Sequence, residues 1–155
     1  MLFQIGSFIA PACRSLGRQA GWARETEEPM ETMVQDLANC SVLLVEDDYY
    51  IADDLGQLLN AHGAVLLGPV QTLETALALI QASERIDGAV VDINLRGEMS
   101  FPVADALQER GIPFVFATGY SAAAIPDRYR HVPRWEKPYR LRDLVQALQA
   151  LIHRS

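Results

Sequence analysis

The feature that most constrains the fold of this chain is a repeated alternation of short apolar runs with amphipathic stretches after residue 41. The apolar runs favour buried strands, whereas stretches with apolar residues at helical spacing, such as Ile51, Leu55 and Leu59, favour helices. The alternation occurs five times, which indicates five strands and their helical connections. The expected strands are 42–45, 64–70, 88–91, 113–117 and 134–136.

Connections of helix length require parallel strands joined by right-handed crossovers, with helices on both faces of the sheet. The sequence therefore predicts an α/β fold with a doubly wound five-stranded parallel sheet. At this size we expect the flavodoxin-like (βα)5 arrangement with strand order 2-1-3-4-5. The interval between Thr118 and Lys137 is short and contains Pro126 and Pro133, so we expect a shortened or irregular fourth helix within 121–129.

The first part of the chain differs from the rest. Residues 1–38 show no sustained strand or helix period and are rich in Gly, Arg, Glu and Thr, which is typical of a flexible leader. Met30 and Met33 lie just before the ordered pattern, so an extension introduced by the gene model is an equally good explanation. We place the folded domain at 41–154, with both cysteines, Cys13 and Cys40, outside it.

Charge and hydropathy exclude several classes of function. A net charge of −7 and a pI near 4.9 argue against direct nucleic-acid binding. No apolar run is long enough to cross a bilayer, so membrane insertion is not expected. The first 13 residues have no basic residue before their apolar part and make a poor signal peptide. Two cysteines without metal-ligand spacing fit a reducing compartment, and the expected localisation is cytoplasmic.

Polar residues follow the expected strands at the points where those strands end. Glu46 and Asp47 follow the first strand, Asp92 the third, Thr118 the fourth and Lys137 the fifth. Carboxyl ends of parallel strands share one edge of the sheet, where ligands bind. Two like charges at about 4 Å repel by roughly 4 kcal/mol at an effective dielectric of 20. A cluster of carboxylates is therefore expected to bind a cation that offsets this repulsion. Oxygen-only ligands favour Mg²⁺.

Two observations qualify this prediction. Asp47 or the neighbouring Asp48 could simply cap the following helix, as acids at such positions often do. Lys137, by contrast, is the only lysine among 13 basic residues, the others being arginine. A compact ammonium suits a mobile phosphoryl oxygen better than a planar guanidinium does.

Four motifs in this order resemble the receiver domain of bacterial two-component response regulators. They are the segment VLLVEDD (42–48), the segment VVDINL (90–95), Thr118 after FVFA, and the pair Lys137–Pro138. The resemblance covers about residues 41–154. It also implies that the peptide bond between Lys137 and Pro138 is cis.

The resemblance implies a role for each matched residue. Asp92 would accept a phosphoryl group from a sensor histidine kinase or a phosphotransfer protein. Glu46, Asp47, Asp92 and the backbone carbonyl of Asn94 would hold Mg²⁺. Thr118 would hydrogen-bond one phosphoryl oxygen and Lys137 would pair with another. Asp48 lies one position beyond the acidic pair, so we interpret it as a helix cap or a supporting residue.

The chain departs from the family pattern at the position where many receivers carry a switching aromatic. That position is Arg134, and the adjacent Trp135 faces the opposite side of its strand. The string PFVFATGY (113–120) is similar to the FATGUY-type subfamily of single-domain receivers, which often have a mobile or shortened fourth helix. Tyr120 could replace the missing aromatic, or it could only pack within its loop.

Three functions remain open at this point. The first is a phosphoacceptor signalling protein that works through a separate downstream protein, with only self-phosphorylation and self-dephosphorylation as activities. The second is an interaction module with the receiver fold that does not depend on phosphorylation. The third is a Mg²⁺-dependent phosphatase with an aspartyl nucleophile. Such enzymes need a second acid two residues after the nucleophile, where this chain has Asn94.

Overall fold

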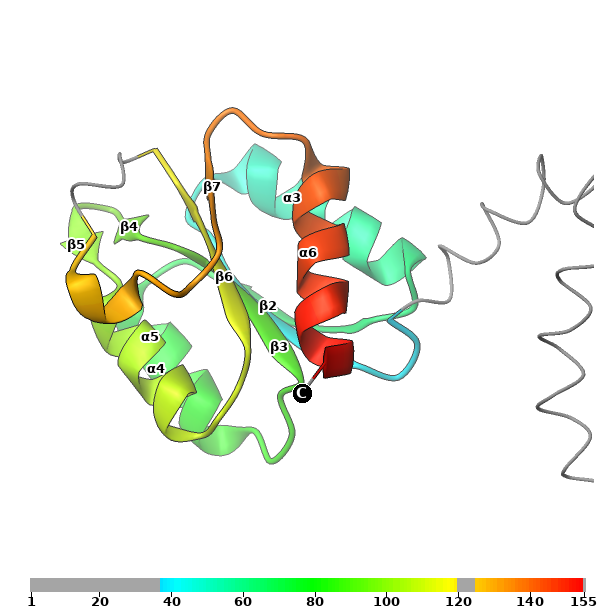
Figure 1. The fold of residues 1–155 in the computed structure, drawn as a ribbon, viewed down its shortest axis with the longest axis horizontal. Helices are drawn as coiled ribbons and strands as arrows, with labels where there is room; N and C mark the ends of the chain where they lie inside the picture. Colours follow the sequence, from blue (N-terminus) through cyan, green and yellow to red (C-terminus); the bar gives the residue numbers. More distant parts are fainter. Residues whose placement is uncertain (1–36, 120–124, 155) are drawn as a thin grey trace, which may run out of the picture. The chain divides into compact units, whose positions relative to one another are not determined.

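The computed structural model of the chain describes residues 37–119 and 125–154. Its centre is a five-stranded parallel sheet with the order β2-β1-β3-β6-β7, so the predicted order 2-1-3-4-5 is confirmed (Figure 1). Each strand lies within one residue of its predicted bounds. The strands are β1 (Ser41–Val45), β2 (Val65–Val70), β3 (Gly88–Asp92), β6 (Phe114–Thr118) and β7 (Arg134–Glu136).

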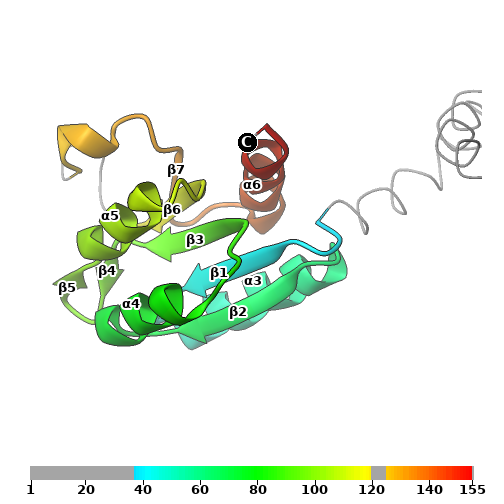
Figure 2. The ribbon, with the colours of Figure 1, turned by 90° about the horizontal axis from the view of Figure 1, so that it is seen from below.

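In the described part of the chain, four α-helices cover the two faces of this sheet. They are α3 (Tyr49–Ala61), α4 (Leu73–Ala82), α5 (Phe101–Glu109) and α6 (Leu141–Arg154). Helices α4 and α5 lie on one face, and α3 and α6 lie on the other (Figure 2). Because successive strand residues point to opposite faces, Leu43, Val91 and Phe116 pack beneath α4 and α5, while Val42 and Val90 pack beneath α3 and α6. Among the described residues, no helix is long and apolar enough to span a membrane.

The helix ends follow from local side-chain chemistry. The Thr72 side chain accepts a hydrogen bond from the Thr75 backbone N–H and caps α4. Asp48 caps α3 by accepting the backbone N–H groups of Tyr50 and Ile51. Asp48 is therefore a helix cap, and Asp47 stays available for the site.

The folded part starts earlier than the sequence pattern indicates. Leu37 is fully buried and its N–H donates to the carbonyl of His62 at 2.8 Å. The Cys40 carbonyl accepts the Val65 N–H at 2.7 Å, and its side chain belongs to the core between the sheet, α3 and α6. The prediction that Cys40 lies outside the fold is wrong, because a turn with Asn39 at φ 65° returns Leu37 to the core. Residues 1–36 lie outside the described residues.

A small second sheet after β3 was not predicted. It is a hairpin of β4 (Asn94–Leu95) and β5 (Glu98–Met99), joined by Arg96 and Gly97. Both turn residues have positive φ, 52° and 92°, as a two-residue hairpin turn of type I′ requires. The Arg-Gly pair was the available signal, but its strands are too short to give an alternation pattern.

The connection between β6 and β7 contains, in its described part, only one turn of 3-10 helix, η2 (Asp127–Tyr129). This short element agrees with the expectation of a shortened or irregular fourth helix. Tyr120, the candidate replacement for the missing aromatic, lies outside the described residues.

Gly68 should tolerate no side chain. It has φ 101°, and a Cβ there would lie 2.8 Å from the Leu44 carbonyl oxygen and 2.9 Å from the Val70 backbone N. We expect Gly68→Ala to lower the free energy of unfolding by well over the about 1–3 kcal/mol that a left-handed backbone alone costs. Gly97 is the matched control, because its φ is 92° and a Cβ would meet no atom within 4 Å. Urea unfolding that gives equal losses for Gly68→Ala and Gly97→Ala would contradict the contact argument.

Candidate functional site

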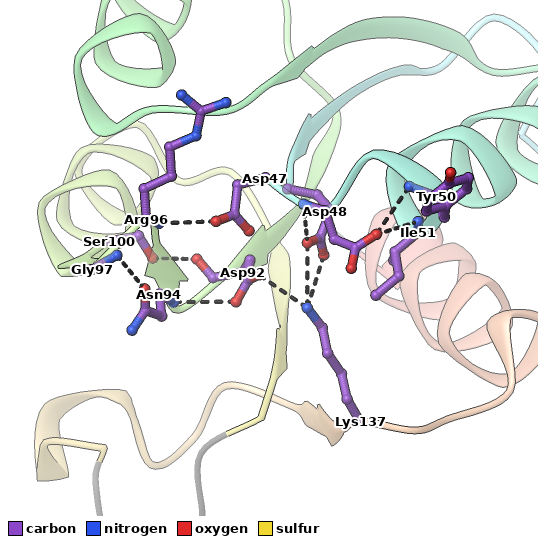
Figure 3. Close-up of polar contacts among 11 residues, drawn as sticks. Asp47, Asp48, Tyr50, Ile51, Asp92, Asn94, Arg96, Gly97, Ser100 and Lys137 are labelled. Carbon is purple, nitrogen blue, oxygen red and sulfur yellow. Dashed lines mark hydrogen bonds and ion pairs between the residues drawn. The ribbon is translucent and has the colours of Figure 1, made fainter.

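The carboxyl edge of the main sheet brings together the charged residues that the sequence singled out (Figure 3). Glu46 follows β1 directly, Asp92 is the last residue of β3, and Lys137 follows β7 directly. The Lys137 backbone N–H donates to the carbonyl of Thr118, the last residue of β6, at 2.8 Å. Because β1, β3, β6 and β7 are neighbours in the sheet, four residues distant in sequence end at one place.

The Lys137 ammonium is the centre of this arrangement. Its Nζ donates to Asp92 Oδ2 at 3.0 Å and lies 3.2 Å from Glu46 Oε1 and 3.3 Å from Glu46 Oε2. The side chains of Glu46 and Asp92 are only 1% and 6% exposed, whereas that of Lys137 is 24% exposed. One cation on a flexible stem therefore contacts two buried carboxylates, offsets part of their negative charge and can be reached from solvent.

The proton affinities of these groups reflect their burial and their mutual charge. Burial, followed by the negative charge of Asp92, raises the pKa of Glu46 to about 7. Burial also raises the pKa of Asp92, although its hydrogen bond and attraction to Lys137 oppose the rise. Burial by itself lowers the pKa of Lys137, but the hydrogen bond and charge of Asp92, with the charge of Glu46, outweigh it and raise that pKa. One ammonium therefore does not fully neutralise the two acids.

A third carboxylate lies beside this buried pair. Glu46, Asp47 and Asp92 each offer one oxygen, and these oxygens all lie within 4.8 Å of one another. Three carboxylate oxygens form a donor set that suits a hard divalent cation such as Mg²⁺. The incomplete charge compensation at Glu46 and Asp92 is the condition that such an ion would relieve. The residues therefore fit a metal site.

The hairpin β4–β5 holds the outer carboxylate. The Arg96 backbone N–H donates to Asp47 Oδ2 at 2.9 Å (Figure 3). The Gly97 N–H in turn donates to Asn94 Oδ1 at 2.7 Å, which fixes the turn. Sequence reasoning missed Arg96, because its contribution is a backbone group whose position depends on a turn.

The backbone around Asp92 is fixed on both sides. The Asn94 N–H donates to Asp92 Oδ1 at 3.1 Å, and the hydroxyl of Ser100 donates to the Asp92 carbonyl at 2.6 Å. Ser100 precedes α5 but makes no side-chain cap on it, because its hydroxyl donates to the Asp92 carbonyl. The Asn94 carbonyl as a metal ligand remains a prediction.

The structure thus brings together Glu46, Asp47, Asp92 and Lys137. Backbone hydrogen bonds link Asn94 to Asp92 and Thr118 to Lys137. Thr118 is fully buried at the end of β6. Arg134 pairs with Phe116 across β6 and β7, while Trp135 packs against the core of the opposite face, so Trp135 does not take the place of an aromatic at 134. The peptide bond between Lys137 and Pro138 is cis, as expected.

Comparison with known proteins gives a consistent result at the level of structure. No protein-family model and no curated protein matches the chain. The BeF3-activated conformation of SdrG from Pseudomonas melonis Fr1 is similar, with 40% identity and a TM-score of 0.61, over 74% of this chain and 98% of that one.

Two further structures match over similar lengths. The non-phosphorylated HemR receiver domain from Leptospira biflexa has 25% identity and a TM-score of 0.63, over 74% of this chain and 94% of that one. A response regulator receiver protein from Sinorhizobium medicae WSM419 shares the fold at 24% identity and a TM-score of 0.65, over 76% of this chain and 97% of that one.

Proposed function

This chain belongs to the receiver family of response regulators, and on that premise we propose that it accepts a phosphoryl group on Asp92 from a histidine kinase or a phosphotransfer protein. The observation that carries the proposal is the Lys137 ammonium 3.0 Å from Asp92 Oδ2, on a buried carboxylate that ends β3. A carboxylate at a strand end, with a mobile cation beside it, is equipped to attack phosphorus and to hold the transferred oxygens.

The proposed phosphoryl transfer forms one bond to phosphorus and breaks another. A carboxylate oxygen of Asp92 attacks the phosphorus of a phosphohistidine, forming a P–O bond while the P–N bond breaks. The electron pair of the P–N bond remains on the imidazole nitrogen of the donor. The product is an aspartyl phosphate, and we propose that Lys137 then follows the charge to a phosphoryl oxygen while the Thr118 hydroxyl binds another.

The proposed cofactor is Mg²⁺. When bound, it would neutralise the charge that develops on the transferring phosphoryl oxygens. Glu46, Asp47 and Asp92 would hold it, together with the Asn94 carbonyl. Arg96 keeps Asp47 in place through its backbone N–H, so the metal-binding acid is oriented before any ion arrives.

The assignment to a subfamily of receivers is also a proposal. We place the chain in the FATGUY-type group of single-domain receivers because of the string PFVFATGY and the basic residue at 134. In this proposal the receiver unit comprises residues 41–154 with the turn that precedes it, and the output passes to a separate protein. The single 3-10 turn in the described part of the β6–β7 connection agrees with this placement.

The alternatives predict different chemistry. A phosphorylation-independent module has no use for a buried acid pair whose pKa values are raised, since such a pair destabilises the fold. A phosphatase with an aspartyl nucleophile needs a second acid at the position of Asn94, and the Asn94 side chain instead accepts the Gly97 N–H and fixes the hairpin turn. Incubation with Mg²⁺ and acetyl phosphate labels the phosphoacceptor and leaves the interaction module unlabelled. Only the phosphatase would also hydrolyse a phosphoester over many turnovers.

Mg²⁺ should raise the thermal stability of the protein, and Asp47→Asn should remove most of that rise. An ion that binds only the folded state adds roughly 1.4 kcal/mol at ten times its Kd. Asp54→Asn, on the exposed side of α3, is the control and should keep the full response. Melting curves in millimolar Mg²⁺ that match those in EDTA, or a full response in Asp47→Asn, would remove the metal from this site.

A further inference from the structure

One fully buried tyrosine fastens the β6–β7 connection to the helix that follows the Asp92 loop. Tyr129, in η2, stacks on Phe101 with a centroid distance of 5.3 Å and an interplanar angle of 12°. It meets Phe116 of β6 edge to face at 5.8 Å. The three rings pack against one another, because Phe101 also contacts Phe116 at 6.4 Å.

The hydroxyl of this tyrosine gives the packing a polar anchor. It donates to a carboxylate oxygen of Asp105 on α5 and lies 3.2 Å from the Phe101 carbonyl oxygen. The Arg128 guanidinium lies 4.5 Å from the Tyr129 ring centroid, and its Nε is 3.5 Å from Asp105. A single side chain therefore makes the ring contacts and the hydrogen bond that tie η2 to α5. We call Phe101, Asp105 and Tyr129 the latch.

Two continuous routes connect the latch to Asp92. Along β6, Phe116 lies two residues before Thr118 on the same face of the strand, and its ring touches Tyr129. The Thr118 carbonyl accepts the Lys137 backbone N–H, and the Lys137 ammonium binds Asp92. Along the other route, Ser100 binds the Asp92 carbonyl, and the next residue, Phe101, stacks on Tyr129. Tyr129 is where these routes meet.

From this geometry we infer that Tyr129 couples the state of Asp92 to the β6–β7 connection. Tyr129 lies in η2, outside β7, and takes the place of the aromatic that is missing at position 134. The latch is formed while the Asp92 carboxylate is bonded to Lys137 and to the Asn94 N–H. Drawing Thr118 toward a phosphoryl group displaces the end of β6 and with it the Phe116 ring. The latch therefore stabilises the arrangement with a free Asp92 carboxylate, and phosphorylation weakens it.

The inference rests on the proposed phosphorylation of Asp92 and adds a quantitative consequence. Coupling between two sites is reciprocal in free energy, so weakening the latch must tighten the binding of a phosphoryl analogue at Asp92. Tyr129→Phe keeps the three rings and removes only the anchor. We expect it to bind beryllofluoride with Mg²⁺ about fivefold more tightly than the unaltered protein, measured by calorimetric titration.

A double-mutant cycle separates this coupling from loss of stability. Asp105→Ala removes the acceptor from the other side of the hydrogen bond and should reproduce the tighter binding, and the double variant should add little more. Val145→Ala, in the core of the opposite face, lowers stability without touching the latch and should leave the affinity unchanged.

Each outcome decides between specific claims. An affinity of Tyr129→Phe that is unchanged or lower, while the unaltered protein binds beryllofluoride, overturns the coupling and leaves the proposed function intact. If the unaltered protein does not bind beryllofluoride, or if Asp92→Asn binds it equally well, then the phosphoacceptor assignment fails and the coupling fails with it.

Discussion

Asp92→Asn should reduce covalent phosphate incorporation to background and leave the fold intact. Asparagine keeps the shape of the side chain but has no carboxylate oxygen to attack phosphorus. The change also removes one charge from a buried acid pair whose pKa values are raised, while Lys137 keeps Glu46 as its partner. We therefore expect unfolding in urea, without metal, to give a stability equal to or above that of the unaltered protein.

Asp48→Asn is the matched control for this result. Asp48 is the acid that follows Glu46 and Asp47 in the loop after β1. It caps α3, and asparagine caps helices nearly as well. This variant should take up phosphate at the normal rate from acetyl phosphate with Mg²⁺. Phosphate incorporation by Asp92→Asn at a comparable rate, as an acid- and base-labile linkage, would move the nucleophile to another residue.

The sequence predicted the sheet and the residues at its edge because both depend on local patterns. Apolar runs mark buried parallel strands wherever they occur, and the residue after each run must lie at the carboxyl edge. For this reason Glu46, Asp92 and Lys137 could be brought together before any contact was known. Their distances and the pKa of about 7 at Glu46 depend on burial, which no local pattern contains.

The features that were missed depend on tertiary contacts or on single turns. Cys40 was placed outside the fold because the turn that returns Leu37 to the core shows no period. Arg96 acts through its backbone N–H, so its side-chain type carried no signal. Tyr129 is one aromatic in a proline-rich connection, and only its fully buried position beside Phe101 distinguishes it from a surface tyrosine.

Lys137→Met should lower the free energy of unfolding by about 3 kcal/mol at pH 8 in EDTA, because it leaves two buried carboxylates without their cation. Lys137→Arg keeps a positive charge and should recover most of that loss. Mg²⁺ should also restore stability to Lys137→Met, since the ion neutralises the same acids. Urea unfolding of the three proteins with and without Mg²⁺ provides the measurement.

The stabilisation that Lys137 provides should depend on pH. The attraction to Lys137 acts only while the acids are ionised, and Glu46 takes up a proton as pH falls through about 7. At high pH the contribution is lost again when the ammonium, whose pKa is raised above its ordinary value near 10.5, loses its proton. The difference between the unaltered protein and Lys137→Met should therefore be largest between about pH 7 and 10 and should shrink toward pH 5. A difference that is constant from pH 5 to 9 would mean that Lys137 stabilises the fold by packing its stem and not by its charge.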